Sequence, residues 1–344
     1  MATIKDIAQL TNVSTATVSN VLNGKSGAAG IEKAKEILET AKKLDYQPNM
    51  LAKNLKLQRT NTIGVITEDL TVFNTPEIVD GIDEVCEKKG FEIILANMRL
   101  HKRYQNDFSD TDGSEKLFYN ILLNLRSKQI EGVIYVGYHC REIPYLPENE
   151  KLPFVYAYCF PKKNAYPSVL FNDEKAGYDV VRLLLSKGHK KIGIISGPMD
   201  NYNAQVRLKG VQRALYEAGI LYNVETTKFG DWEQSSGYYH TDALLAQNVT
   251  AIFAFNDIMA TGVYKRCLEL GLTIGKDISL IGYDNKDVDE RYAHPLASVE
   301  IPLNEMGRKS ADLVIQQIGQ QPLDLNPIYL PCTIRDRSSL GSLI

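Results

Sequence analysis

The sequence predicts a small all-α headpiece followed by an α/β body built from two doubly wound parallel-sheet lobes. Two short amphipathic helices open the chain, and from Asn61 onward short apolar strands alternate with helices. The strands are near-continuous runs of Val and Ile, as in parallel sheets that helices cover on both faces. A chain of 344 residues is long enough for two or three domains.

The start of the headpiece carries helix signals at three positions. Thr3, followed three residues later by Asp6, is typical of a capping box. Asn12 lies where the chain must turn sharply, and Asn tolerates a positive φ. Ser14 is then expected to cap a second helix. This arrangement predicts a helix-turn-helix.

The second helix has one apolar and one polar face. Val18, Val21 and Leu22 recur at helical spacing and are expected to face the core. Short polar and methyl-bearing side chains cover the other face, and such side chains can reach base edges and phosphates in a DNA groove. Other small helical hairpins show the same pattern. We predict that the headpiece residues that contact DNA are Thr3, Ser14, Thr15, Ala16, Thr17, Ser19, Asn20 and Asn23.

A third helix completes the predicted headpiece. It runs from Ile31 to Leu44 and is expected to turn Ala34, Ile37, Leu38 and Ala41 inward. Pro48 then stops the helical pattern. The predicted boundaries are 1–47 for the headpiece, 48–60 for a hinge helix and linker, and 61–340 for the body.

Several motifs resemble the LacI/GalR family of bacterial transcriptional regulators, over nearly the whole chain. They are the run Val13-Ser14-Thr15-Ala16-Thr17-Val18-Ser19, the run Leu44-Asp45-Tyr46-Gln47-Pro48-Asn49, and Leu51-Ala52 with Leu55. The resemblance implies a periplasmic-binding-protein-like body. It also implies a hinge helix that orders on the operator and wedges a leucine into the minor groove. Leu55 occupies that position here, with Asn49 and Lys53 as further DNA contacts; a plain linker is the alternative.

The body is predicted to hold a first and a second set of alternating elements. In the first set the strands are 62–67, 91–96, 132–136 and 154–158, and the helices are 77–89 and 113–127. In the second set the strands are 191–196, 250–255 and 278–283, and the helices are 173–187, 203–218, 235–245 and 257–270. A late helix, 303–318, and a final strand, 328–334, follow.

Polar and aromatic residues fall just past several of these strands, where ligands of α/β sheets bind. Asn256-Asp257 follows one strand, Asp284 follows another, and Arg207 and Trp232 lie in connecting segments. Asp, Asn and Arg can grip vicinal hydroxyls, and an aromatic ring can stack on a sugar. There are structural alternatives: Asp257 can cap its helix, Asp284 can hold a loop, and Trp232 can belong to the core.

The resemblance assigns these positions to an effector pocket. Arg207, Trp232, Asn256 and Asp284 match positions that line it, and Phe73, Asn74 and Pro76 match its first-lobe wall. We expect a small sugar as the effector. The full set of predicted effector residues is Phe73, Asn74, Pro76, Tyr158, Asn203, Arg207, Trp232, Asn256, Asp257 and Asp284.

The chain departs from the family pattern at three functional positions, one of which is the loop Ala28-Ala29-Gly30-Ile31, where the Thr-Arg phosphate contacts of many members are missing. Tyr158-Cys159 stands where sugar-binding members often place an aspartate, and a phenol cannot accept two hydrogen bonds as a carboxylate does. Asn20 stands where Arg is frequent. Because Asn suits adenine and Arg suits guanine, the operator is expected to differ at that base pair.

Charge and composition agree with a DNA-binding head on a soluble sensor. Residues 1–60 hold nine Lys or Arg against five Asp or Glu, whereas the whole chain has a formal charge of −3. The five cysteines are scattered, as expected for thiols in a reducing compartment. Lys5 and Asp6 interrupt any apolar leader, and no stretch has the length of a membrane span. A cytoplasmic location is expected.

Other functional classes lack their motifs. No two glycines are spaced Gly-x-Gly, and Gly-x-Ser-x-Gly and His-Glu-x-x-His are missing, so an enzyme is not expected, nor is a cofactor or metal. An exported solute-binding protein would lack the basic headpiece. A nucleobase or a phosphoprotein corepressor stays open as the effector. The resemblance implies a homodimer on a pseudo-palindromic operator, since the chain ends without a leucine-heptad tail after Arg335-Asp336-Arg337.

Overall fold

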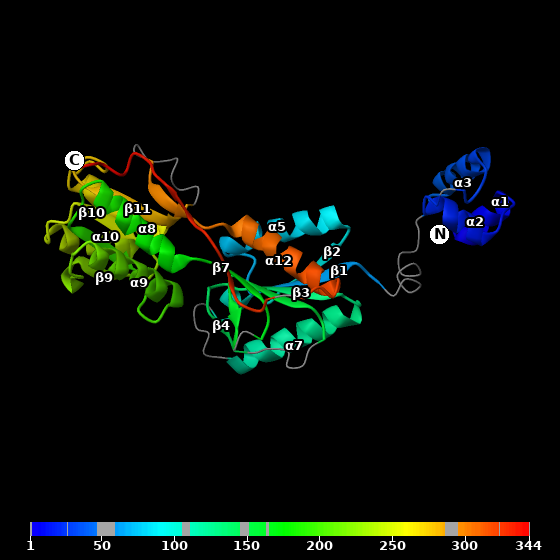
Figure 1. Ribbon diagram of the computed structural model, residues 1–344, viewed down its shortest axis with the longest axis horizontal. Helices are drawn as coiled ribbons and strands as arrows, with labels where there is room; N and C mark the ends of the chain where they lie inside the picture. Colours follow the sequence, from blue (N-terminus) through cyan, green and yellow to red (C-terminus); the bar gives the residue numbers. More distant parts are fainter. Residues whose placement is uncertain are drawn as a thin grey trace. The chain divides into compact units, whose positions relative to one another are not determined.

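The computed structural model describes residues 2–25, 27–46, 59–104, 111–144, 151–162, 165–285, 295–322 and 324–343. The chain divides into two compact units, Met1–Thr60 and Asn61–Ile344 (Figure 1). The predicted hinge helix, with Asn49, Lys53 and Leu55, lies outside the described residues. These three DNA contacts therefore stay predictions.

The described residues of the first unit form three short helices, α1 (Ile4–Leu10), α2 (Thr15–Leu22) and α3 (Ile31–Lys43). Thr3 and Asp6 form the predicted capping box, and Asn12 takes the predicted positive φ, 48°. Each helix buries apolar residues in one small core, including Ile7, Val18 and Ile37, all fully buried. The helix-turn-helix prediction is confirmed.

One prediction for the third helix is wrong. Leu38 was expected to face inward but is 51% exposed. The buried residues of α3 are Ile37 and Ala41, which are four residues apart and share one face of the helix. Leu38 is the next residue after Ile37, so its side chain leaves the helix in a different direction. The apolar stripe is thus narrower than the sequence pattern indicates.

The first lobe of the body is a parallel sheet with the strand order β13-β7-β5-β3-β1-β2. Its strands are β1 (Thr62–Thr67), β2 (Glu92–Asn97), β3 (Gly132–Val136), β5 (Phe154–Ala157), β7 (Ser168–Phe171) and β13 (Ile328–Leu330). Helices α5 (Asn74–Lys89) and α12 (Leu303–Ile318) pack side by side against one face, and α7 (Thr111–Ser127) packs against the other (Figure 1). A short helix, α6 (Leu100–Tyr104), follows β2.

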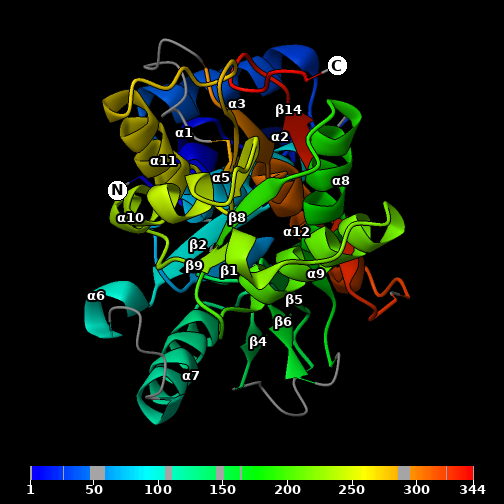
Figure 2. The ribbon, with the colours of Figure 1, turned by 90° about the vertical axis from the view of Figure 1, so that its left-hand side faces the viewer.

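The second lobe repeats this plan with the strand order β14-β12-β11-β10-β8-β9. Its strands are β8 (Ile192–Ser196), β9 (Thr227–Phe229), β10 (Ala251–Ala254), β11 (Ser279–Asp284), β12 (Ala297–Glu300) and β14 (Thr333–Arg335). All pair in parallel except β14, which is antiparallel to β12. The helices are α8 (Asp173–Ser186), α9 (Tyr202–Glu217), α10 (Gln234–Leu245) and α11 (Asp257–Glu269), with α8 beside α9 (Figure 2). The predicted pair of doubly wound lobes is confirmed.

The predicted final strand, 328–334, is in fact two strands in two different sheets. Residue Pro331 has no N–H to donate to a ladder, so the strand breaks there. Strand β13 joins the first lobe and β14 joins the second. Strands β7, β9 and β12, each of three or four residues, were not predicted.

The described chain passes between the lobes at three short segments. They lie between β7 and α8, between β12 and α12, and between β13 and β14. The first of them contains Asn172, whose side chain caps α8. A two-stranded ribbon, β4 (Glu142–Ile143) with β6 (Phe160–Pro161), lies at the end of the first lobe.

Candidate functional sites in the headpiece and the body

In the headpiece, several predicted DNA contacts also hold the helices in place. The Ser14 hydroxyl accepts a hydrogen bond from the Thr17 N–H at 3.1 Å and lies 2.9 Å from the Thr17 hydroxyl. The Asn23 amide donates to the Ser19 carbonyl at 2.6 Å, and Thr3 belongs to the capping box. Ser14 and Asn23 thus fix the two ends of α2, and Thr3 fixes the start of α1.

The remaining predicted contacts present free polar or methyl groups. Thr15 and Ala16 are exposed in the first turn of α2, and Asn20 is half-buried one turn further on. No described residue shares a side-chain hydrogen bond with the Asn20 amide. An amide in this position can pair with the edge of a base.

In the second lobe the predicted residues Arg207 and Asn203 converge on a residue that was not predicted, Asp173. Arg207 Nε donates to Asp173 Oδ1 at 2.7 Å and Arg207 Nη2 donates to Oδ2 at 3.2 Å. The Asn203 amide donates to Oδ2 at 2.9 Å, and the Tyr283 hydroxyl donates to Oδ1 at 2.8 Å. Arg207 and Asp173 are 3% and 4% exposed, so this is a buried ion pair whose hydrogen bonds are well satisfied.

Two further contacts hold the Arg207 guanidinium. Its Nη1 donates to the Phe255 carbonyl, and its Cζ lies 3.2 Å from the centre of the Tyr283 ring. Burial opposes its charge, but Asp173 outweighs burial and raises the pKa of Arg207. Arg207 therefore stays cationic with its side chain fixed.

Tyr158 and Asp284 lie within electrostatic reach of this group although they come from different lobes. Tyr158 follows β5, is 7% exposed and stacks on Phe171 with ring centres 5.4 Å apart. Burial raises the pKa of Tyr158 well above its ordinary value. The negative charge of Asp284 adds to this shift, and the positive charge of Arg207 opposes it. The phenol is therefore a hydrogen-bond donor at neutral pH.

Three of the predicted effector residues have strained backbones. Tyr158, Trp232 and Asp284 have φ values of 61°, 73° and 102°, in the left-handed region that non-glycine residues rarely adopt. Each follows or ends a strand, or lies in the loop beyond one. Such strain concentrates at functional sites, where the surrounding structure maintains it.

Trp232 and Asn256 are joined in a further part of the second lobe. The Asn256 amide donates to the Trp232 carbonyl at 2.9 Å, and its oxygen caps α11 by accepting from the Met259 N–H at 2.8 Å. The indole ring lies so close to Gly197 that a Cβ there would overlap it. Asp257 is fully buried and accepts a hydrogen bond from the Ser298 hydroxyl on β12 at 2.7 Å, so it packs α11 against the sheet. As an effector contact it stays a prediction.

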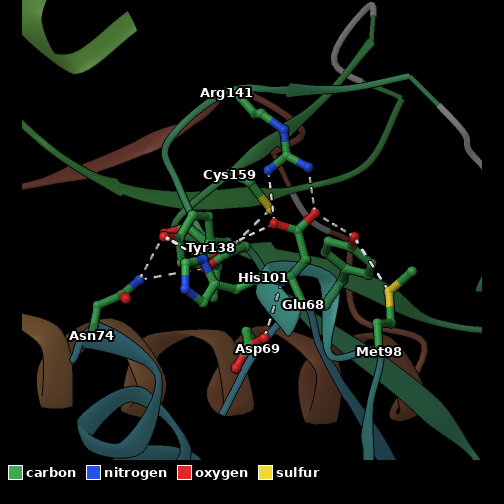
Figure 3. Close-up of polar contacts among 11 residues, drawn as sticks. Glu68, Asp69, Asn74, Met98, His101, Tyr138, Arg141 and Cys159 are labelled. Carbon is green, nitrogen blue, oxygen red and sulfur yellow. Dashed lines mark hydrogen bonds and ion pairs between the residues drawn. The ribbon is translucent and has the colours of Figure 1, made fainter. Parts of the chain in front are cut away.

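The first-lobe counterpart centres on Glu68, which directly follows β1 (Figure 3). The two Arg141 Nη atoms donate to the two Glu68 oxygens, both at 2.7 Å. The Tyr135 hydroxyl and the Tyr138 N–H also donate to this carboxylate, each at 2.6 Å. Burial works to raise the pKa of Glu68, but Arg141 and these hydrogen bonds hold it below the ordinary value.

The other predicted first-lobe residues lie beside this pair. The buried Asn74 amide donates to the carbonyls of Gly137 and Tyr138, both at 3.4 Å, while Phe73 is 39% exposed and Pro76 is exposed. His101 stacks on Tyr138 with ring centres 5.8 Å apart (Figure 3). Burial raises the pKa of Tyr138, and the charges of Asp69 and of Glu233 from the second lobe add to this shift, so the two lobes face each other here.

Sequence reasoning missed Asp173, Glu68 and Arg141. Glu68 directly follows a predicted strand, and the rule applied to Asp284 would have identified it. Asp173 was counted only as the start of a helix, because the strand before it, β7, was not predicted. Arg141 carries no signal in its own neighbourhood, since its partner is 73 residues away.

Across the described residues, no group of three or more His, Cys, Asp or Glu side chains could hold a metal ion. Within the same part of the chain, no helix combines the length and apolar character needed to cross a membrane.

Two protein families match separate parts of the chain. Residues 3–49 match the family described as bacterial regulatory proteins, lacI family, and residues 181–340 match the periplasmic binding protein-like domain.

Individual proteins are similar over almost the full length. The HTH-type transcriptional repressor PurR of Vibrio vulnificus (strain CMCP6) is 30% identical over 331 residues, which is 94% of each chain. Catabolite control protein A of Priestia megaterium is 32% identical over 342 residues, 98% of each. The crystal structure of the lac repressor dimer bound to operator and the anti-inducer ONPF matches with a TM-score of 0.77, 24% identity and 99% coverage of both chains; this likeness concerns the fold.

Proposed function

Because the chain belongs to the lacI family of bacterial regulatory proteins and is a DNA-binding transcriptional repressor, we propose that a small sugar bound between its two lobes sets its affinity for operator DNA. Two chains form a homodimer, and two copies of α2 read a pseudo-palindromic operator. The sugar changes the angle between the lobes, and this change alters operator binding. A coupling of about 1 to 3 kcal/mol between the two sites is enough for such a switch.

The sugar proposal rests on one observation: the Arg207 guanidinium is held in place by Asp173 and Phe255. A guanidinium has five N–H donors, and three of those of Arg207 are used by Asp173 and Phe255. Two N–H donors remain for ligand oxygens. A ligand rich in hydroxyl groups fits such a site, because each hydroxyl both accepts and donates.

The neighbouring side chains extend this hydrogen-bonding capacity. The Tyr158 phenol is a donor, and the Asp284 carboxylate at the end of β11 is an acceptor within electrostatic reach of it. The buried Ser196 hydroxyl, at the end of β8, has no partner among the described residues. Donors and acceptors at the carboxyl ends of strands support a polar, uncharged ligand.

Thermal unfolding against a ligand panel tests this proposal. Sugars, nucleobases and their phosphates are each added to the full chain, and a ligand at about 100 times its Kd stabilises the protein by about 2.7 kcal/mol. We expect a sugar to raise the Tm, and Arg207→Ala to abolish the shift. A nucleobase hit with no sugar hit would replace the sugar by a nucleobase, and no hit at all would favour a protein corepressor.

A further inference from the structure

Asp173 occupies an unusual place in the body. It is the first residue of α8 and directly follows the segment that leaves β7, so it lies where the chain passes from the first lobe to the second. Its carboxylate accepts four hydrogen bonds at 2.7 to 3.2 Å, two on each oxygen. With both oxygens occupied and only 4% exposure, Asp173 is built to hold other side chains.

The main group that Asp173 holds is the Arg207 guanidinium. The side-on pair through Nε and Nη2 fixes the guanidinium plane, and the Tyr283 ring supports it 3.2 Å from Cζ. The donors that remain on Nη1 and Nη2 therefore have defined directions before any ligand arrives. A fixed donor pair binds a ligand oxygen with less loss of side-chain entropy than a mobile one.

The same network reaches a second passage between the lobes. The Tyr283 hydroxyl, which donates to Asp173, lies 3.7 Å from the Cys332 sulfur. Cys332 lies between β13 in the first lobe and β14 in the second. Two of the three passages between the lobes thus meet at the group that holds Arg207.

We propose that Asp173 is the positioning residue of the effector site, which fixes Arg207 for the ligand and joins it through Tyr283 to two of the segments that connect the lobes. This inference rests on the proposed function, since it assumes that a ligand binds at Arg207. Asp173 itself does not touch the ligand. A shift of Arg207 on binding acts directly on Asp173 and Tyr283, and so on the angle between the lobes.

Three substitutions test the proposal. Asp173→Asn keeps the size of the side chain but removes its charge and one acceptor, and Tyr283→Phe keeps the ring but removes the hydroxyl. Glu174→Gln is the matched control: Glu174 is the next residue of α8, and it pairs with Lys209 and Arg213 outside the site. All three variants are made in the full chain, and the sugar is the one that shifts the wild-type Tm.

Calorimetric titration gives the first measurement. Loss of a charge-assisted hydrogen bond is expected to raise the sugar Kd of Asp173→Asn about 10- to 100-fold, and the control is expected to stay within about twofold. Tyr283→Phe is expected to bind the sugar but to show a smaller change in operator affinity at saturating sugar. Wild-type sugar affinity in Asp173→Asn would overturn the proposal.

A second measurement needs no ligand. The protein is labelled with ¹⁵N-arginine, and the signal of the Arg207 Nε–H is identified by its loss in Arg207→Lys. This proton should exchange slowly with water in the wild type and at least tenfold faster in Asp173→Asn. Equal exchange in both would contradict the positioning role. If no sugar binds the wild type, the proposed function fails, and this exchange experiment still decides whether Asp173 fixes Arg207. If Asp173→Asn does not fold, the exchange experiment is made on Tyr283→Phe, which lacks one of the four hydrogen bonds to Asp173, and Nε–H exchange equal to that of the wild type would contradict the positioning role.

Discussion

Glu68 and Arg141 form a bidentate ion pair at the carboxyl end of the first-lobe sheet, and both oxygen–nitrogen distances are 2.7 Å. The Glu68 side chain is fully buried and that of Arg141 is 22% exposed. The charge of Glu68 therefore depends on a single guanidinium and two hydrogen bonds for its stabilisation.

Arg141→Leu should destabilise the body by about 3 to 5 kcal/mol, because it leaves a buried carboxylate without its cation. Urea unfolding followed by circular dichroism measures the loss. The double variant Glu68→Gln with Arg141→Leu should recover part of it, since the buried charge is then removed. A single variant within about 0.5 kcal/mol of the wild type would contradict the assigned role of the pair.

Gly210→Ala should destabilise the second lobe, because helices α8 and α9 touch backbone to backbone there. A Cβ at Gly210 would overlap the Glu174 carbonyl oxygen, just as one at Gly177 would overlap that of Arg207. We expect a loss of roughly 1 to 3 kcal/mol in spite of the better helix propensity of Ala. Gly319→Ala, whose Cβ would have its nearest neighbour at 3.4 Å, is the control and should be neutral or slightly stabilising.

Stability should fall as the pH drops below about 6.5, in part because of His139. Burial disfavours its imidazolium form, Arg141 adds to this effect, and the pKa of His139 is lowered to about 4 against 6.5 in the unfolded chain. As the pH falls, the unfolded chain therefore takes up the proton at a higher pH than the folded chain does. The contribution of His139 to the free energy of unfolding is fully present above pH 6.5 and is lost towards pH 4.

Unfolding midpoints at pH 7.5, 6.0 and 5.0 measure this slope in the wild type and in His139→Gln. The variant should have a shallower slope but keep part of it, since burial also lowers the pKa of His189. Identical slopes would show that His139 does not carry the effect.

Asn20→Ala should relax operator recognition at one base pair. If the amide reads an adenine, its loss costs about 1 to 3 kcal/mol of discrimination at that position and little elsewhere. Binding to a set of operators with single base-pair changes measures this. Lys25→Ala, on the exposed loop after α2, is the contrasting variant, and any loss there should be the same for all sequences. A uniform loss in Asn20→Ala would exclude base reading by Asn20.

The sequence predicted the elements whose signals are local. The capping box at Thr3 and Asp6 and the turn at Asn12 depend on a few neighbouring residues, and both agree with the structure. The long buried strands also agree. The break at Pro331 was missed because the apolar run continues past it, and only the pairing partners show that the two halves belong to different lobes.

The candidate site was predicted only in part, for a related reason. Arg207 and Asn203 were identified, but their common partner Asp173 lies about 30 residues away, and no spacing rule links them. Long-range pairs of this kind depend on how strands are ordered in the sheet. Because strand β7 was not predicted, Asp173 was not identified as a residue at a strand end.

The sugar-switched repressor is tested most directly by titrating the full chain against an operator selected from random DNA, with and without the sugar that raises its Tm. We expect specific binding with a Kd that changes at least about fivefold at saturating sugar, and we expect Arg207→Ala to bind the operator but no longer to respond to the sugar. Operator binding that no sugar changes at any concentration would contradict the sugar switch, and the absence of specific DNA binding would contradict the repressor function itself.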